Sequence, residues 1–356
     1  MVPYRDQVRI AIVGTDVCAL DRRGGGLEHV VLRWAAQVAN THEVVLVSFT
    51  PGGRPLDLAP CGPEAVPVHR VADLGPALRR IAPDVVSLHN RPHWWRHCPQ
   101  RARVAVTFHN FAPAWKVPAS AWPALVDDAD CLQLAAVSGA LAAEVAARLA
   151  VPVSRVAVTP PSIDPAFLDP PAANLASRPP VVLSPNRLLR KKGVRDLLAV
   201  ARRPVFAGVE FVFVDLISPW LTPTAEHRAL RAAVRAAPNA TLVPPAAAPA
   251  ELARWYASCG VVACAVREPE GLGLVALEAQ ACAAPLVTTD LGGLCEATFP
   301  PNRCIPPKSL PTLADALAEA LATDRSRADA RRRVLERHSP TAAGGVFLRW
   351  VAEAVP

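Results

Sequence analysis

Short apolar runs alternate with segments of helical periodicity along most of the chain. The first group joins a strand at 8–14, an amphipathic helix at 27–40 and a second strand at 44–49. This strand–helix–strand succession is the unit from which parallel sheets are built. Further runs predict strands at 84–89, 104–109, 131–137, 181–184, 209–214, 241–243, 261–266 and 286–289, and helices at 74–81, 228–236 and 313–321. We therefore predict an α/β protein.

One segment interrupts this alternation. Residues 169–180 are rich in proline and alanine and show no apolar period, which is typical of a linker. The chain has 356 residues, of which 51% are hydrophobic, so two domains of ordinary size can each form a core. We predict a first domain at 1–170, a second at 171–336 and a closing helical segment at 337–356.

The most informative stretch is residues 268–281, Glu-Pro-Glu-Gly-Leu-Gly-Leu-Val-Ala-Leu-Glu-Ala-Gln-Ala, which follows a buried strand and leads into a helix. Glu270 sits in the loop, and Glu278 lies eight residues later, inside the helix. Eight helical steps place both near one face, roughly 12 Å apart along the axis. Gly271 and Gly273 let a ligand approach the backbone, and a helix start favours phosphate. A sugar–diphosphate–nucleoside fits this pattern, with the sugar at Glu270 and the ribose at Glu278.

Two other interpretations of this stretch stay open. It is also compatible with an ordinary strand–loop–helix that carries a solvated glutamate. The half-match to a dinucleotide fingerprint, Gly-Leu-Gly at 271–273, is the second alternative. That fingerprint usually follows the first strand of a fold, whereas this one comes late in the chain.

Residues 270–279, Glu-Gly-Leu-Gly-Leu-x-x-x-Glu-Ala, resemble the E-x7-E motif of retaining glycosyltransferases of the family 4 type. The resemblance implies the GT-B fold: two Rossmann-like domains that face each other across a cleft, with the last helix crossing back onto the first domain. It also implies that Glu270 holds the donor sugar, that Glu278 holds the ribose, and that Gly271, Leu272, Gly273 and Leu274 line the donor site.

Arg187 and Lys192 stand at a predicted strand-to-helix turn. Two cations there can stabilise the charge on a leaving diphosphate, although a solvated basic turn explains them equally well. They match an Arg and a Lys of the family, so the resemblance implies a catalytic diphosphate clamp. The family also carries a glycine loop where this chain has Gly25 and Gly26, and there it faces the diphosphate; a flexible connection is the alternative.

Two predicted strands of the first domain end in histidine, at His89 and His109, and each histidine is followed by asparagine. Ligands of open α/β sheets bind beyond the carboxyl ends of strands. The resemblance implies that His109 contacts the donor sugar near the reacting carbon, with a purely structural histidine as the alternative. For the acceptor we consider the polar and aromatic residues near these loops: Asp16, Asp21, Glu28, His89, Asn110 and Trp115.

The net charge and the cysteine spacing limit the classes of ligand and metal that we expect the chain to bind. The net charge is +7, which suits anionic ligands, but the basic residues are dispersed and no nucleic-acid motif accompanies them. We therefore expect a nucleotide sugar rather than a nucleic acid. The nine cysteines show no C-x-x-C spacing and are expected to be free buried thiols. Asp128-Ala-Asp130 is expected to be a surface turn, and the enzyme to need no metal and no cofactor.

These observations predict a retaining glycosyltransferase that moves a sugar, with UDP-sugars favoured, to a small soluble acceptor. An aminocyclitol or aminoglycoside intermediate of antibiotic biosynthesis is our first candidate. The alternatives are a lipid or cell-envelope acceptor, a sugar-nucleotide epimerase of similar fold, and an inactive binding protein. A lipid acceptor would let the first domain dock on an anionic membrane through Arg79, Arg80, Arg96, Arg101 and Arg103.

The expected location is the cytoplasm. The polar beginning of the chain runs into the first strand without a visible signal peptide, and no apolar run approaches the roughly 20 residues of a membrane span.

Overall fold

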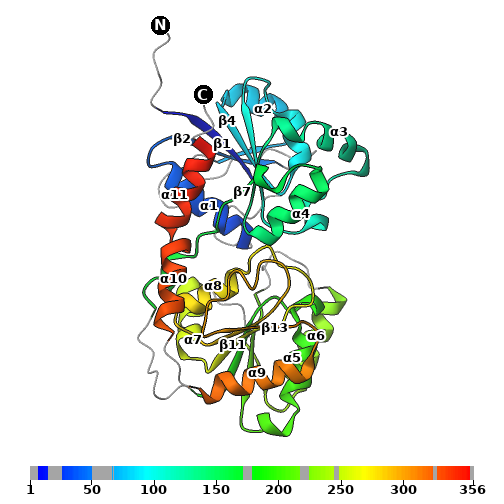
Figure 1. The fold of residues 1–356 in the computed structure, drawn as a ribbon, viewed down its shortest axis with the longest axis vertical. Coiled ribbons are helices and arrows are strands. Elements are labelled where there is room, and N and C mark those ends of the chain that lie inside the picture. The colour runs from blue at the N-terminus through cyan, green and yellow to red at the C-terminus, as the bar shows by residue number, and fades with distance from the viewer. Residues whose placement is uncertain are drawn as a thin grey trace. The chain divides into compact units, whose positions relative to one another are not determined.

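A computed structural model describes residues 7–14, 26–49, 66, 68–170, 179–216, 224–243, 248–323 and 327–352. The chain divides into two compact units, which are coloured along the sequence in Figure 1. The first unit holds residues 1–162 together with 340–356, and the second holds 163–339.

The first unit is built on a parallel sheet. Among the described residues, seven strands lie in the order β3-β2-β1-β4-β5-β6-β7. The order reverses between β1 and β4, which is where open α/β sheets usually bind ligands. The strands are β1 (Arg9–Gly14), β2 (Glu43–Phe49), β3 (Val68–Val71), β4 (Val85–His89), β5 (Arg103–Phe108), β6 (Gln133–Ala136) and β7 (Val156–Val158).

Two of the helices of the first unit begin at side-chain caps. The Asp73 carboxylate accepts the Gly75 N–H at 3.2 Å where α2 begins, and the Ser138 hydroxyl accepts the Leu141 N–H at 3.2 Å where α4 begins. The helices of this unit are α1 (Gly26–Val38), α2 (Leu74–Ile81), α3 (Trp122–Asp127), α4 (Gly139–Leu149) and α11 (Pro340–Ala352).

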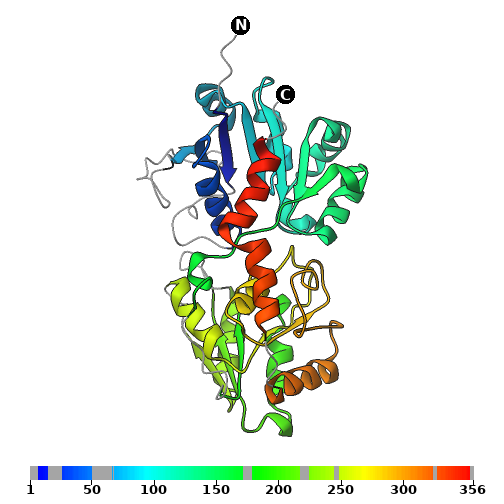
Figure 2. The same ribbon diagram turned by 60° about the vertical axis from the view of Figure 1, so that its left-hand side comes forward.

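The last helix, α11, belongs to the first unit. It packs beside α1, as Figures 1 and 2 both show. The Trp34 and Phe347 rings stack with centroids 4.4 Å apart, and a Cβ on Gly344 would lie 2.4 Å from the Gln37 Cγ. Glycine therefore permits the close approach of the two helices, and the predicted return of the chain end to the first domain is confirmed.

The second unit has the same architecture, a parallel sheet with helices. Its described residues form a six-stranded parallel sheet in the order β10-β9-β8-β11-β12-β13, which reverses between β8 and β11. The strands are β8 (Val181–Pro185), β9 (Glu210–Val214), β10 (Ala240–Val243), β11 (Val261–Cys264), β12 (Leu286–Thr289) and β13 (Arg303–Ile305). The helices are α5 (Val194–Ala201), α6 (Ala225–Arg235), α7 (Pro249–Ser258), α8 (Leu274–Ala281), α9 (Leu310–Ala322) and α10 (Ala328–His338).

Two Rossmann-like units confirm the predicted fold class, but the boundary between them differs from our prediction. It falls after residue 162 rather than after 170, and the second unit ends at 339 rather than 336. The reason is local packing. The Ile163 N–H donates to the His338 carbonyl at 2.8 Å, and the Phe167 ring lies 5.8 Å from the Tyr256 ring. Residues 163–168 are thereby held on the second unit.

Candidate functional site

The loop that follows β11 is fixed by backbone pairing to a glycine turn. The Glu270 N–H donates to the Leu291 carbonyl at 3.3 Å, and the Gly293 N–H donates to the Glu270 carbonyl at 2.9 Å. Glu270 and Gly292 thus form a parallel bridge. This pairing joins segments about twenty residues apart and sets the direction of the Glu270 side chain.

Lys192 and Glu270 form an ion pair. The Lys192 Nζ donates to the Glu270 Oε1 at 2.6 Å, and the side chains are 14% and 22% exposed. The backbone supports this contact, because the Arg267 N–H donates to the Lys191 carbonyl at 2.8 Å. The structure therefore brings together two of the predicted site residues that lie 78 positions apart in the chain.

Gly193 lets the lysine-bearing turn lie directly on the end of β11. Its φ is +72°, and a Cβ there would come within 1.8 Å of the Ala265 carbonyl oxygen. A second ion pair holds the same junction: the Arg267 guanidinium donates to both carboxylate oxygens of Asp196, at 2.6 and 2.8 Å. The turn, the strand end and the start of α5 are thus one connected structure.

Arg187 lies on the loop that leaves β8, five residues before Lys192, and its side chain is exposed. An exposed guanidinium on this loop is accessible to an anion. The proposed clamp with Lys192 remains a prediction, because no contact joins the two side chains.

The start of α8 leaves Glu270 in the loop and Glu278 in the helix, as predicted. The helix begins at Leu274, after an N-cap at Gly273 with φ +96°. Because Glu270 precedes the helix, the helical geometry that we used to place both glutamates on one face does not apply to it. A Cβ on Gly273 would meet the Leu294 Cδ2 at 2.4 Å, so the tight entry needs glycine. The first N–H groups of any helix have no intrahelical acceptor, so the start of α8, at Leu274 and Val275, offers donors for an anion.

Glu278 lies within α8 and is only 9% exposed. The Tyr256 hydroxyl donates to its Oε2 at 3.1 Å. We did not predict a role for this tyrosine from the sequence. The one feature that could have indicated it is a hydroxyl group on the otherwise apolar, buried face of α7. Burial, followed by the Glu278 charge, raises the pKa of Tyr256 well above its ordinary value, so the phenol stays protonated and donates.

The Cys264 thiol at the end of β11 lies within electrostatic range of three of the site's charged groups. Burial raises its pKa to about 12, and the charges of Lys192, Glu270 and Glu278 all act on it as well. The Lys192 ammonium and the Glu270 and Glu278 carboxylates thus lie near the carboxyl end of this strand, where the strand order reverses. Carboxylates bind hydroxyl groups, and an ammonium beside a helix start binds phosphate.

The first unit holds a buried histidine pair. The His89 Nδ1 lies 2.9 Å from the His109 Nε2, and the His89 Nε2 lies 3.2 Å from the Ser87 Oγ. Burial lowers the pKa of His89 to about 3, and burial together with His89 lowers the pKa of His109 well below its ordinary value. Both rings are therefore neutral near pH 7, and one nitrogen of the pair donates to the other.

Two predicted acceptor contacts are wrong. The His89 side chain is fully buried and both its ring nitrogens are engaged, so it does not meet a ligand directly. Trp115 is also fully buried: its ring lies 4.5 Å from the Phe108 ring, and its Nε1 donates to the Asn110 carbonyl. Both are core residues, because the His89 ring packs among the rings of Trp34 and Phe347 and the Trp115 ring packs against Phe108.

The other candidates of the first unit have different outcomes. Asn110 is exposed just beyond β5, and its Oδ1 accepts the Asn90 Nδ2 at 2.9 Å. Gly26 begins α1, and Glu28 is half-buried in the first turn of that helix. Asp16, Asp21 and Gly25 lie outside the described residues.

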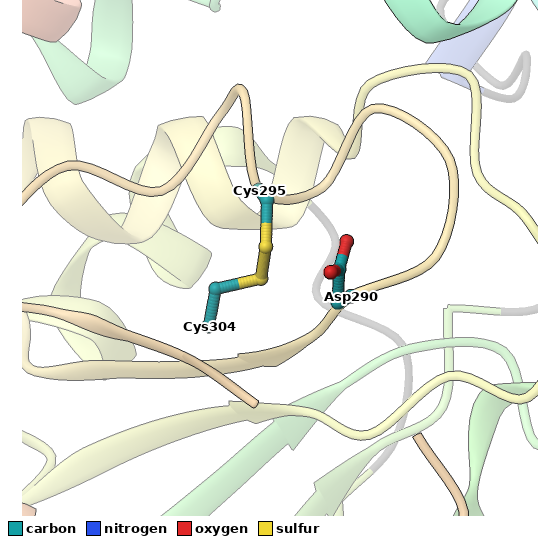
Figure 3. Close-up of side chains that lie close together, drawn as sticks. All are labelled: Asp290, Cys295 and Cys304. Atoms are coloured by element: carbon teal, nitrogen blue, oxygen red, sulfur yellow. A yellow bond between two sulfur atoms is a disulfide. The ribbon is translucent and has the colours of Figure 1, made fainter. Parts of the chain in front are cut away.

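Cys295 and Cys304 form a disulfide, which corrects our expectation of free thiols (Figure 3). The bond joins the loop after β12 to β13. The exposed Asp290 carboxylate lies within 4.8 Å of both sulfur atoms. Since the sulfur atoms are bonded to each other, they offer no thiolate to a metal ion. In the part of the chain that the structure describes, the free cysteines are Cys98, Cys131, Cys259, Cys264 and Cys282.

The predicted turn at Asp128 and Asp130 is confirmed. Asp128 ends α3, and Asp130 lies exposed in the short helix that follows, where its carbonyl accepts the Arg155 Nη2 at 2.8 Å. None of the helices in the described ranges combines the length and apolar character needed to span a bilayer.

Two family models match the chain in succession. The model described as Glycosyltransferase Family 4 matches residues 24–167, and the model described as Glycosyl transferases group 1 matches 168–337. Solved structures agree in fold. HepE of Anabaena in complex with UDP-glucose is 14% identical, with a TM-score of 0.76, over 98% of this chain and 100% of that chain. A glycosyltransferase of Rickettsia africae is 17% identical, with a TM-score of 0.73, over 98% of this chain and 99% of that one.

Curated relatives match a shorter part. The D-inositol 3-phosphate glycosyltransferase of Pseudarthrobacter chlorophenolicus is 34% identical over 170 residues, which is 44% of this chain and 39% of that protein. The protein of the same name from Paenarthrobacter aurescens is 33% identical over 177 residues, which is 46% of this chain and 42% of the relative. The matches thus span about two fifths of these relatives.

Proposed function

Since the chain belongs to the glycosyltransferases of the family 4 type, we propose that it moves a sugar from a nucleotide diphosphate donor to an acceptor hydroxyl, with retention of anomeric configuration. One observation carries the proposal. The Lys192 ammonium pairs with the Glu270 carboxylate at 2.6 Å just before the start of α8, and the Glu278 carboxylate lies within that helix, so the segment offers one ammonium and two carboxylates to an elongated ligand.

Each group has a role in the proposed reaction. Lys192 and Arg187 stabilise the charge on the leaving diphosphate, which is the largest electrostatic change in the reaction. Glu270 accepts hydrogen bonds from donor sugar hydroxyls, and Glu278 accepts them from the ribose. His109, kept neutral by burial, contacts the sugar as a hydrogen-bonding partner rather than as a charge.

No separate nucleophile is needed if transfer occurs on the front face. The acceptor hydroxyl then bonds to the anomeric carbon as the carbon–phosphate oxygen bond breaks, and the departing phosphate takes the acceptor proton. In this scheme Lys192 and Arg187 supply the positive charge, so the reaction needs no metal ion.

A UDP-sugar is our first candidate for the donor. HepE, which has the same fold, binds UDP and UDP-glucose, and this supports the choice. The curated relatives are named for an inositol phosphate acceptor, which is a ring polyol. That name supports a small cyclitol or aminocyclitol acceptor, as an antibiotic intermediate would provide. The cytoplasm is the compartment that supplies nucleotide sugars.

A transfer assay tests the function. The full chain is incubated with UDP- and GDP-sugars and with inositol, inositol phosphate or 2-deoxystreptamine, and the products are identified by mass spectrometry and the anomeric configuration by NMR. We expect transfer with retention, and its loss in Glu270→Gln. Release of an epimerised nucleotide sugar, or no turnover of any donor, contradicts the proposal.

A lipid acceptor is the second candidate, and one observation favours it. Arg79, Arg80, Arg96 and Arg101 are all exposed on the first unit. Arg103 is not part of this surface, because its Nη2 donates to the Val351 carbonyl at 2.5 Å. Co-sedimentation with vesicles of anionic and of neutral lipid decides between the candidates: strong binding to anionic vesicles alone favours the lipid acceptor.

A further inference from the structure

A buried phenol meets the carboxylate that we assign to the ribose. Tyr256 is fully buried on α7, and its hydroxyl donates to the Glu278 Oε2 at 3.1 Å. The two helices that carry these residues, α7 and α8, pack against each other in the second unit (Figure 1). The contact therefore links a residue that has no assigned role to one at the centre of the site.

The tyrosine ring has little freedom to move. It packs edge-to-face against the Phe167 ring, with centroids 5.8 Å apart, and α7 buries Leu252, Ala253 and Ala257 on the same side. A phenylalanine would satisfy all of these apolar contacts. A hydroxyl in this place costs free energy of desolvation unless it is hydrogen-bonded, and Glu278 provides that partner.

We propose that Tyr256 is a positioning residue for donor binding, which holds the Glu278 carboxylate in the orientation that accepts hydrogen bonds from the ribose hydroxyls. The inference rests on the proposed function of Glu278. It adds a residue on another helix, whose effect reaches the nucleotide only through that carboxylate.

The physical reason is preorganisation. A glutamate has three rotatable side-chain bonds, and fixing them when a ligand binds reduces affinity. Tyr256 fixes them before the nucleotide arrives. Burial also raises the pKa of Tyr256 well above its ordinary value, so the phenol keeps the proton that it donates to Glu278.

The ribose hydroxyls provide a direct test. Binding of UDP and of 2′,3′-dideoxy-UDP to the full chain is measured by titration calorimetry. Because hydrogen bonds to a charged group are strong, we expect the wild type to bind UDP about 10-fold or more tightly than the dideoxy analogue. In Tyr256→Phe we expect the preference to fall to about 3-fold or less, with the melting temperature measured in parallel.

Two further variants separate positioning from a general loss of structure. Ser258→Ala removes a hydroxyl from the same helix that donates to the Arg254 and Trp255 carbonyls, and it should leave the preference unchanged. Glu278→Gln should lower the preference, and adding Tyr256→Phe to it should lower the preference no further, because the two changes act on one contact.

The outcomes distinguish the inference from the proposed function. If the wild type prefers UDP and Tyr256→Phe keeps the full preference, the positioning role is wrong and the role of Glu278 stands. If Tyr256→Phe lowers the preference equally in the Glu278→Gln background, the tyrosine acts through general structure, and the inference is again wrong. If the wild type binds both nucleotides equally, the ribose role of Glu278 fails and the inference fails with it.

Discussion

Replacing Lys192 by methionine removes the cation beside Glu270 but keeps a side chain of similar length. The two charged groups are 2.6 Å apart and their side chains are 14% and 22% exposed, so water screens the pair only in part. We expect the free energy of unfolding to fall by about 1–2 kcal/mol, between the values for surface and for buried pairs. For a domain of this size that corresponds to a melting temperature lower by about 2–8 °C.

The effect on catalysis should be larger. A preorganised charge that faces a leaving group contributes about 100-fold to 1,000-fold to kcat. The assay follows the release of UDP from a UDP-sugar that the wild type turns over. Lys192→Arg keeps the charge and should lose less activity than Lys192→Met.

A double variant tests the pair itself. Removing both charges, in Lys192→Met with Glu270→Gln, should restore part of the stability lost in Lys192→Met, because no unpaired carboxylate remains. A double variant less stable than Lys192→Met contradicts the ion pair. Lys192→Met with kcat within about 3-fold of the wild type refutes the role of the ammonium in catalysis.

Three more predictions follow from named contacts. Gly193→Ala should lower the free energy of unfolding by about 2 kcal/mol or more, because φ is +72° and the new Cβ would lie 1.8 Å from a backbone oxygen. Gly208→Ala, whose new Cβ would have no atom within 4 Å, is the control and should change the free energy of unfolding by less than about 0.5 kcal/mol. Urea denaturation measures both variants. The pKa of His89 is about 3 in the folded protein and about 6.5 in the unfolded chain, so between these values the unfolded chain binds one more proton. The free energy of unfolding should therefore fall as the pH is lowered, by about 2 kcal/mol from this residue at pH 5. His89→Asn should flatten that pH dependence, and an unchanged dependence argues against a neutral buried ring. Iodoacetamide at pH 8 should modify the exposed Cys131 in the native protein and spare Cys264, whose thiol is buried and has a pKa of about 12. Mass spectrometry of the peptides gives the order in which the cysteines are modified. Modification of Cys264 before Cys131 would contradict the prediction.

Much of the fold follows from apolar patterning, because long buried strands and helices dominate it. The elements that we did not predict are short or weakly patterned. The strands β3 and β13 have three or four residues, lie at sheet edges and contain polar residues. The helix α7 follows directly on a proline- and alanine-rich loop, and its apolar period is masked by that composition.

The site shows a different limit. Glu270, Glu278 and Lys192 were predicted because their types and spacing carry chemical meaning. The geometry that positions them depends on segments distant in the chain, such as the bridge from Glu270 to Gly292 and the phenol of Tyr256. Periodicity contains no information on such pairs.

The histidines illustrate the same point in the first unit. Their position after two adjacent parallel strands was predicted, and β4 and β5 do pair side by side. What the pattern could not tell is that the two rings hydrogen-bond to each other, which buries His89 and removes it from ligand contact. The disulfide between Cys295 and Cys304 could likewise not be predicted from the sequence, because two cysteines nine residues apart do not indicate by their spacing that they are paired.

The central claim is that one nucleotide sugar lies across the carboxyl end of β11, and a crystal structure of the full chain soaked with UDP or UDP-glucose tests it most directly. We predict the ribose hydroxyls within hydrogen-bond distance of Glu278, the diphosphate beside Lys192 and the start of α8, and the sugar at Glu270. A nucleotide bound elsewhere, with Glu270 and Lys192 still paired and untouched by the ligand, would contradict the account.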